Sequence, residues 1–348
     1  ILIGLVGSEM CIRDRDKWAT VKKALAEGTK GREYKRNIAM RRKMFYDFSH
    51  TMFRISKRYN SKVEITAEAH NYGGFVVGSD QLWLPSNIEG DYYSLNFVPV
   101  DIPKIALSTS FGISRLPKVQ AVKAAKFLKR FDFISVREVS GQKIVKQLTG
   151  RDVPVVCDPT ILFTAEEWGC ITKKERFYNE PYLFCYFLGN NPEQREFVRR
   201  VKEITGCKIV QLQHCDEYIK SDVEFPDYAP YNVGPAEFVQ LIRDAEYVFT
   251  DSFHASVFSL LYQKKFFTFR RYNNDSVVST NGRLYSLLAL VGQENRLLKG
   301  DEYVNDVLVR TVDYNKVHAR LAELRSFTKN YVKDALSKSG IDYDKNYR

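Results

Sequence analysis

The sequence predicts an α/β protein built on parallel sheets, and two observations support this prediction. Short apolar runs alternate with helical patterns along most of the 348 residues, and several runs are β-branched or aromatic without interruption. Such runs are typical of strands covered on both faces, and their alternation with helices implies right-handed crossovers between parallel strands. The length suits two domains, and a hydrophobic share of 44% is enough for two cores.

The elements follow one another in a regular order. The strands are expected in the apolar runs at residues 73–79, 104–110, 132–138, 153–158, 182–188, 207–213, 246–251 and 265–270. The helices are expected in the intervals, where apolar residues recur with a helical period, at residues 117–130, 138–149, 192–205, 234–245, 252–263 and 281–291.

A polar, charged stretch at residues 170–180 separates two strands and suggests a domain boundary. We therefore expect an N-terminal domain at 16–172 and a C-terminal domain at 173–311. A last helix within 312–348 is expected to pack back across the seam. Residues 1–15 resemble translated sequencing-adapter sequence, so we leave them out of the fold prediction and expect the first strand of the N-terminal domain to be missing.

The charge is basic and uneven. The formal net charge is +11, and residues 16–60 hold 13 Lys and Arg against 4 Asp and Glu. Such a segment can meet nucleic acid, an anionic membrane or an anionic substrate, or it can be a solvated helical face. No zinc finger, RNP motif or basic–aromatic alternation is present, so nucleic acid is not an expected partner. Six scattered cysteines without a CxxC pair, and no apolar run of about 18 residues, indicate a cytoplasmic protein.

In an open parallel sheet, ligands bind beyond the carboxyl ends of the strands. At the end of the first clear strand stand Gly78, Ser79, Asp80 and Gln81. Glycine permits close backbone approach, and exposed amides at the following turn favour an anion. The alternative is that Ser79 or Asp80 simply caps a turn.

Arg137 occupies the equivalent position after a later strand. Its planar guanidinium suits a carboxylate or a phosphate, although pairing with the adjacent Glu138 is the structural alternative. The Asp158-Pro159 step after the next run is a turn signature, and we expect it to be structural.

The stretch "VFTDSFHASVFSLL" places a histidine just inside a helix. Thr250, Asp251 and Ser252 end a strand and cap the helix, and His254 lies in its first turn. The positive end of the helix dipole favours a neutral imidazole, which suits acid–base work on an anionic substrate. The alternative is a polar histidine bonded to a neighbouring loop. His214, at another strand end, is a weaker candidate.

Several motifs are absent. The chain has no GxxxxGK[ST], no strand-linked GxGxxG, no GxSxG and no HExxH, which argues against P-loop enzymes, simple dehydrogenases, serine hydrolases and zincins. No cluster with metal-ligand spacing is visible, so we expect neither a metal nor a cofactor.

An ordered set of stretches resembles the polysaccharide pyruvyl transferase family: "FVVGSDQLW", "YYSLNFV", "STSFGIS", "FISVRE", "VCDPTILFTAEEW", "VFTDSFHASVFSLL" and "NGRLYSLLALVGQENR". This resemblance implies two Rossmann-like domains facing a cleft, as in GT-B glycosyltransferases. It also implies transfer of a pyruvyl group from phosphoenolpyruvate to two hydroxyls of a sugar, which forms a cyclic ketal in a surface polysaccharide.

The resemblance also implies roles for particular residues. His254 matches the family's late histidine, and Arg137 matches an arginine at a strand end. Better-studied members often read Arg-Leu-His at the late motif, whereas this chain reads Ser252-Phe253-His254. We therefore expect the missing anion contact to come from Arg283, or from Arg270 or Arg271.

Within this hypothesis, His254 is the acid–base group, and Arg137 and Arg283 bind phosphoenolpyruvate. The turn formed by Gly78, Ser79, Asp80 and Gln81 shapes the acceptor side, and Ser252 lies at the same site.

Two other functions stay open: a GT-B nucleotide-sugar glycosyltransferase, and a non-catalytic scaffold of polysaccharide assembly. The expected acceptor is a polysaccharide repeat unit or a lipid-linked sugar. The basic segment 16–60 would then meet an anionic inner membrane face.

Overall fold

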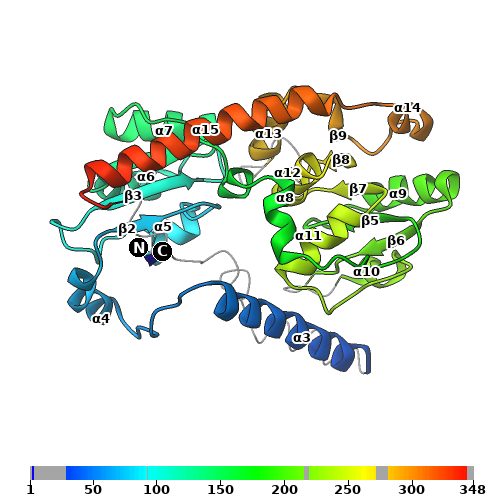
Figure 1. Ribbon diagram of the computed structural model, residues 1–348, viewed down its shortest axis with the longest axis horizontal. Coiled ribbons are helices and arrows are strands. Elements are labelled where there is room, and N and C mark those ends of the chain that lie inside the picture. The colour runs from blue at the N-terminus through cyan, green and yellow to red at the C-terminus, as the bar shows by residue number, and fades with distance from the viewer. Residues whose placement is uncertain (1, 4–28, 92, 215–218, 272–280, 343–348) are drawn as a thin grey trace.

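The structure is a computed structural model that describes residues 2–3, 29–91, 93–214, 219–271 and 281–342. Its described strands form two parallel sheets, one of four strands and one of five. The sheets lie in two lobes side by side, each surrounded by helices (Figure 1). The predicted α/β fold with two parallel sheets is confirmed.

The N-terminal sheet has the strand order β1-β2-β3-β4. Its strands are β1 (Leu2–Ile3), β2 (Phe75–Val77), β3 (Lys104–Thr109) and β4 (Phe133–Val136). Helices follow the last three strands in turn: α5 (Pro85–Gly90), α6 (Lys118–Leu128) and α7 (Val139–Thr149). Most residues of β2, β3 and β4 are buried, as their uninterrupted apolar runs require.

Two features of this lobe differ from the sequence-based expectation. Leu2–Ile3 lie within the segment that we left out, yet they pair with Phe75 and Val76 as the edge strand. The run at 153–158 forms only an isolated bridge, between Val155 and Val136. Pro154 has no N–H to donate to a ladder, so the pairing does not extend.

The C-terminal sheet has the strand order β6-β5-β7-β8-β9. Its strands are β5 (Tyr182–Tyr186), β6 (Lys208–Gln211), β7 (Tyr247–Thr250), β8 (Lys265–Phe269) and β9 (Leu297–Leu298). Its helices are α9 (Pro192–Thr205), α10 (Lys220–Glu224), α11 (Pro235–Asp244), α12 (Phe253–Leu261), α13 (Gly282–Leu290) and α14 (Val304–Leu308). The two-residue strand β9 is too short to leave a pattern in the sequence.

The segment between the sheets packs with the C-terminal lobe. It contains the 3₁₀ turn η2 (Pro159–Leu162) and the short helix α8 (Ala165–Trp168). Cys157 and Ile161 are buried in the C-terminal core, and Trp168 packs against it. Packing therefore places the domain boundary before residue 157, whereas the sequence suggested a boundary after residue 172.

Helix α15 (Tyr314–Lys338) runs across both lobes (Figure 1). Val317 and Leu321 belong to the C-terminal core. Ala335 and Leu336, near its other end, pack with Ile105 of β3. The helix therefore joins the two cores.

Helix α3 (Thr29–Met52) lies against the C-terminal lobe, and the chain then passes to α4 (Lys62–Ala67) beside the N-terminal sheet (Figure 1). Arg41 holds α3 in place, because its guanidinium donates to the carbonyl oxygens of Gln213 and Pro230 at 2.8 and 3.0 Å. Among the described helices, none has the length and apolar character needed to cross a bilayer.

Candidate functional site

Charged side chains from both lobes meet at the carboxyl ends of the strands. Asp80 follows β2 and Arg137 follows β4 in the N-terminal lobe. His254 and Arg283 come from the first turns of α12 and α13 in the C-terminal lobe. Distances of 2.5–3.8 Å connect these groups, directly or through Asp158. The structure thus assembles at one seam residues separated by about 200 positions in the sequence.

The turn after β2 is shaped by its glycine. Gly78 has φ of 153°, and a Cβ atom there would lie 1.8 Å from the carbonyl oxygen of Leu107. The Gly78–Ser79 peptide is cis, and Asp80 has φ of 34°. The Ser79 hydroxyl donates to Asp158 Oδ2 at 3.2 Å. Gly78 thus lets the turn bring Ser79 and Asp80 to the seam.

Gln81 completes this turn, and its carbonyl oxygen accepts from the Asn87 side chain at 3.0 Å. Its buried Nε2 has no hydrogen-bond partner among the described residues. This nitrogen lies against Gly112, where an added Cβ atom would meet it at 2.3 Å, so the Gln81 amide packs against the backbone there.

Arg137 is buried, and Asp158 is its main partner. Its Nη1 donates to Asp158 Oδ2 at 2.5 Å, whereas its Nε lies 3.9 Å from Glu138. Pairing with Glu138, the alternative raised by the sequence, is therefore secondary. Burial alone would lower the pKa of Arg137, but the charges of Asp158, Asp80 and Glu138 raise it above its ordinary value.

Asp158 is the residue whose role the sequence missed. It caps η2 by accepting from the Thr160 N–H, as its turn signature suggested. Its Oδ2 also accepts from Arg137 and Ser79, and it lies 3.8 Å from His254 Nε2. Burial opposes ionisation, yet Arg137 and His254 hold the pKa of Asp158 well below its usual range. The same carboxylate thus caps a turn and joins an arginine to a histidine.

His254 lies in the first turn of α12, and Ser252 caps the helix as predicted. The buried Ser252 hydroxyl accepts from the Ala255 N–H at 3.4 Å. The His254 side chain keeps 34% of its surface exposed, so the imidazole faces Asp158 on one side and solvent on the other. This is the placement that a proton-transferring group needs.

Arg283 is buried at the start of α13, and its ion-pair partner among the described residues is Asp80, at 3.7 Å. Burial and the positive charge of Arg137 lower the pKa of Arg283 to about 9. The guanidinium groups of Arg137 and Arg283 lie 4.4 and 5.9 Å from the ring centroid of Phe253. An anion at this point would relieve the repulsion between the two cations.

Asp80 is the one acid of the site with substantial exposure, 39% of its side chain. Desolvation would raise its pKa, but the charges of His254, Arg137 and Arg283 hold the pKa of Asp80 below its ordinary value. The seam therefore holds an ionised and partly exposed carboxylate at Asp80.

The other candidates have different surroundings. Arg271 lies beside Asp251, 3.7 Å from Nε to Oδ2, and Asp251 accepts from the Leu188 and Gly189 N–H groups. The Arg270 guanidinium lies 5.9 Å from the Tyr285 ring. Neither residue contacts His254 in the described part of the structure.

His214 belongs to another cluster. Its Nδ1 lies 2.6 Å from Asp222, which also pairs with the buried Arg195 at 2.5 Å. Despite burial, hydrogen bonds and charge from His214 and Arg195 lower the pKa of Asp222 to about 2. This compact buried network has no described contact with the seam.

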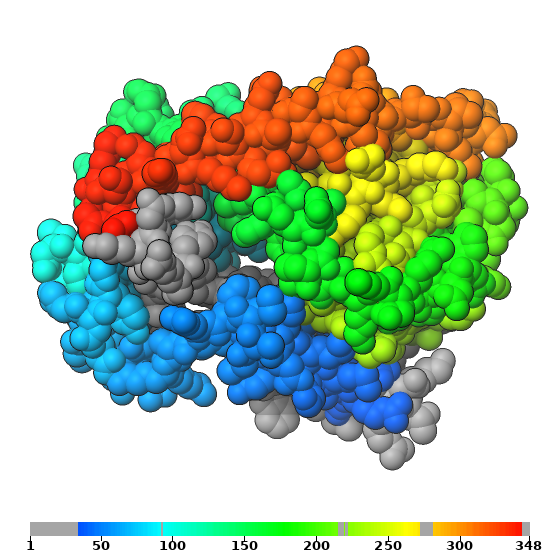
Figure 2. Space-filling view, viewed as in Figure 1, coloured from blue at the N-terminus to red at the C-terminus, as the bar shows by residue number. Residues whose placement is uncertain are grey.

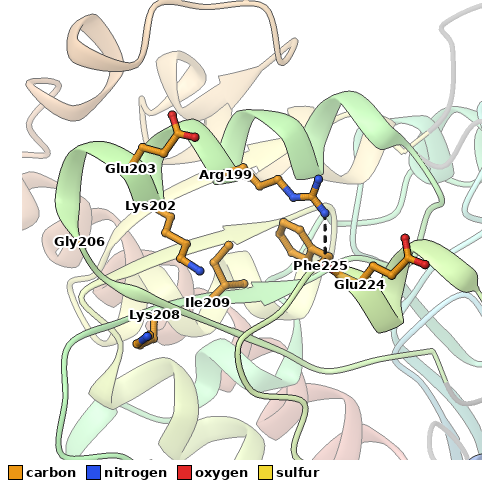
Figure 3. A pocket seen from close by; sticks show the side chains of 8 residues that line it. All are labelled: Arg199, Lys202, Glu203, Gly206, Lys208, Ile209, Glu224 and Phe225. Carbon is orange, nitrogen blue, oxygen red and sulfur yellow. Dashed lines mark hydrogen bonds between the residues drawn. The ribbon is translucent and has the colours of Figure 1, made fainter.

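A hollow of about 400 Å³ lies elsewhere on the C-terminal lobe, between α9, the start of β6 and the end of α10 (Figure 3). Two of its cations are already engaged: Lys202 bonds both carboxylate oxygens of Asp227 at 2.7 and 2.8 Å, and Arg199 donates to the Glu224 carbonyl. Its volume alone does not make it a site. The described residues contain no group of His, Cys, Asp and Glu that could hold a metal ion.

The family model for polysaccharide pyruvyl transferase matches residues 12–273, three quarters of the chain. The chain belongs to this family. All of the seam residues except Arg283 lie within the matched region of this pyruvyl transferase family member. The match begins at residue 12, inside the segment that we set aside.

Solved structures are similar in fold. A UDP-N-acetylglucosamine 2-epimerase shares 12% identity, with a TM-score of 0.51, over 82% of this chain and 80% of its own. A co-structure of S. aureus MnaA with UDP also shares 12% identity, with a TM-score of 0.50, over 83% and 86% of the two chains. At this identity the likeness shows the fold alone, which is GT-B-like. A search of curated proteins finds no significant match.

Proposed function

We propose that this family member transfers the pyruvyl group of phosphoenolpyruvate to two hydroxyls of a sugar in a surface polysaccharide, forming a cyclic ketal. The observation that carries the proposal is the pair of buried guanidiniums, Arg137 and Arg283, beside the half-exposed imidazole of His254. The described carboxylate partner of Arg283, Asp80 at 3.7 Å, leaves its charge weakly paired, which favours binding of a small, densely charged anion.

In the proposed reaction, the arginines bind phosphoenolpyruvate and two sugar hydroxyls then attack its C2 atom in turn. Arg283 and Arg137 bind the carboxylate and phosphate of phosphoenolpyruvate. A proton adds to the methylene carbon, and C2 becomes electrophilic. One sugar hydroxyl then forms a C–O bond to C2 and loses its proton. The second hydroxyl loses its proton and forms a C–O bond to C2 as the C2–O bond to phosphate breaks, so one phosphate leaves for each ketal formed.

His254 is the acid–base group in this scheme. Asp158 orients its imidazole and holds Arg137, which makes Asp158 a positioning residue. The turn formed by Gly78, Ser79, Asp80 and Gln81 shapes the acceptor side, and Asp80 faces the sugar. Ser252 acts through the cap that fixes the first turn of α12.

The direct test is the mass of a candidate glycan after incubation with phosphoenolpyruvate, with phosphate release measured in parallel. His254→Ala should lower the transfer rate by about 10²–10⁴-fold, the usual contribution of a general acid–base group. Its fold should be retained, because the side chain is partly exposed. Near-normal transfer by this variant would remove His254 from the mechanism.

A nucleotide-sugar glycosyltransferase is the second candidate, favoured by the GT-B-like fold and the UDP held by one neighbour of similar fold. Thermal-shift measurements separate the two, because a ligand that binds only the folded protein raises its stability. Stabilisation by phosphoenolpyruvate and not by a nucleotide sugar supports pyruvyl transfer. The reverse result supports the glycosyltransferase, and no shift with either would favour a non-catalytic scaffold.

The acceptor in this proposal is a polysaccharide repeat unit or a lipid-linked sugar, and the reaction takes place in the cytoplasm, where phosphoenolpyruvate is made. No cofactor is required, because phosphoenolpyruvate supplies both the group and the driving force as a co-substrate.

A further inference from the structure

The exposed part of residues 35–58 lies in α3 and in the segment that follows it, and we call it the basic surface. These residues hold eight Lys and Arg against one acid, Asp47. All of these cations are exposed except Arg41. The basic surface lies at the lower edge of the molecule and borders the opening between the two lobes (Figure 2).

The structure decides which face of α3 points outward. Tyr34, Ile38 and Arg41 form the buried face, with Arg41 bonded to the C-terminal lobe. The opposite face of the helix then has a fixed orientation, so its backbone does not need to become ordered on contact with a partner.

Two of the exposed cations are neutralised locally. Lys43 pairs with Asp47, and Lys57 pairs with Glu68. The other five cations have no carboxylate partner in the described part of the chain: Lys35, Arg36, Arg42, Arg54 and Arg58. The basic surface therefore keeps a positive excess that an anionic partner can meet.

Apolar side chains stand among these cations. Met40, Met52 and Ile55 expose 44%, 47% and 51% of their surface, and Phe53 exposes 37%. Three of them lie within four positions, on both sides of the helix end, next to Arg54. Cations alone would suit any polyanion, whereas cations interleaved with apolar groups suit an interface that is charged outside and apolar below.

We propose that the basic surface docks on an anionic lipid bilayer, with Met52, Phe53 and Ile55 entering the headgroup region and the arginines meeting the phosphates. The attachment is interfacial, since no described helix can span a bilayer. The role of this docking rests on the proposed function, because it would hold the opening between the lobes near a lipid-linked sugar acceptor.

The test is co-sedimentation of the full chain with vesicles of phosphatidylcholine, alone or mixed with an equal amount of phosphatidylglycerol. We expect binding only to the anionic vesicles, weakened by salt. Arg54→Glu with Arg58→Glu should reduce the partition coefficient about tenfold or more. Met52→Ser with Ile55→Ser should reduce it about tenfold through the lost apolar contact.

Matched controls come from α6, which exposes lysines and valines on the other lobe. Lys118→Glu with Lys126→Glu, and Val119→Ser with Val122→Ser, should leave vesicle binding unchanged. The proposal would be overturned if the protein bound neutral and anionic vesicles equally, or if the α6 variants lost as much binding as the variants of the basic surface. Binding of duplex DNA without binding to vesicles would also overturn it. Transfer to a soluble glycan is measured separately, so failure of docking and failure of the proposed reaction remain distinguishable.

Discussion

At the scale of single residues, the candidate site contains two ion pairs of different strength, Arg137 with Asp158 and Arg283 with Asp80. Asp158 is 1% exposed and bonds Arg137 at 2.5 Å. Arg283 has a weaker partner at 3.7 Å. Arg137 is therefore the more strongly paired of the two arginines, and Arg283 has the greater capacity left for a ligand.

Asp158→Asn should be strongly destabilising, because it leaves the Arg137 charge buried beside a neutral amide. Removing one partner of a buried pair typically costs about 3–5 kcal/mol. Urea denaturation at neutral pH measures the loss, with Asp152→Asn as the control, since Asp152 pairs with Lys146 at the exposed surface. Loss of less than about 1 kcal/mol would contradict this account.

The pH profile of stability follows from the same carboxylate. The pKa of Asp158 is lower in the fold than in the unfolded chain, where it is about 3.9. Its contribution is therefore complete above that value and is lost as the pH falls toward the lower folded pKa. In Asp158→Asn, the free energy of unfolding should therefore depend less on pH in this acidic range than it does in the parent.

Arg283 makes anion binding sensitive to alkaline pH. Its pKa is lowered to about 9, and a bound anion favours the charged form. The affinity for phosphoenolpyruvate, measured by calorimetry, should therefore fall as the pH rises through about 9. Arg283→Gln should bind more weakly and lose this pH dependence, while Arg320→Gln, on the exposed side of α15, should behave as the parent. Equal affinities of the parent and Arg283→Gln would exclude Arg283 from the anion site.

At the scale of elements, the turn after β2 admits only glycine at residue 78. Its positive φ and the Leu107 carbonyl leave no room for a Cβ atom. Gly78→Ala should destabilise the protein by several kcal/mol or displace Asp80, and so lower transfer activity. Gly90→Ala is the control, because nothing lies within 4 Å of the added atom. Similar melting temperatures for both variants would contradict this reading of the turn.

At the scale of the whole molecule, α15 connects the two cores. Leu321→Ala and Leu336→Ala should each cost about 2–5 kcal/mol, the first in the C-terminal core and the second where α15 meets β3. Phe327→Ala, whose ring is 51% exposed, should change stability little. Hydrogen exchange tests whether Leu336 supports the N-terminal sheet, because Leu336→Ala should then speed the exchange of β3 amides first. Faster exchange in the C-terminal sheet alone would contradict this.

The sequence by itself determined the alternation of strands and helices and the cap at Ser252. It also indicated that Gly78 and Arg137 stand at strand ends and that His254 begins the helix after another strand, because these features depend on local periodicity and on residue types at adjacent positions. Only the tertiary structure decided that Asp158 links Arg137 to His254, that residues 157–171 belong to the C-terminal core, and which face of α3 is exposed. Those features depend on contacts between segments up to about 190 residues apart, and local sequence patterns carry no information about which distant segments meet.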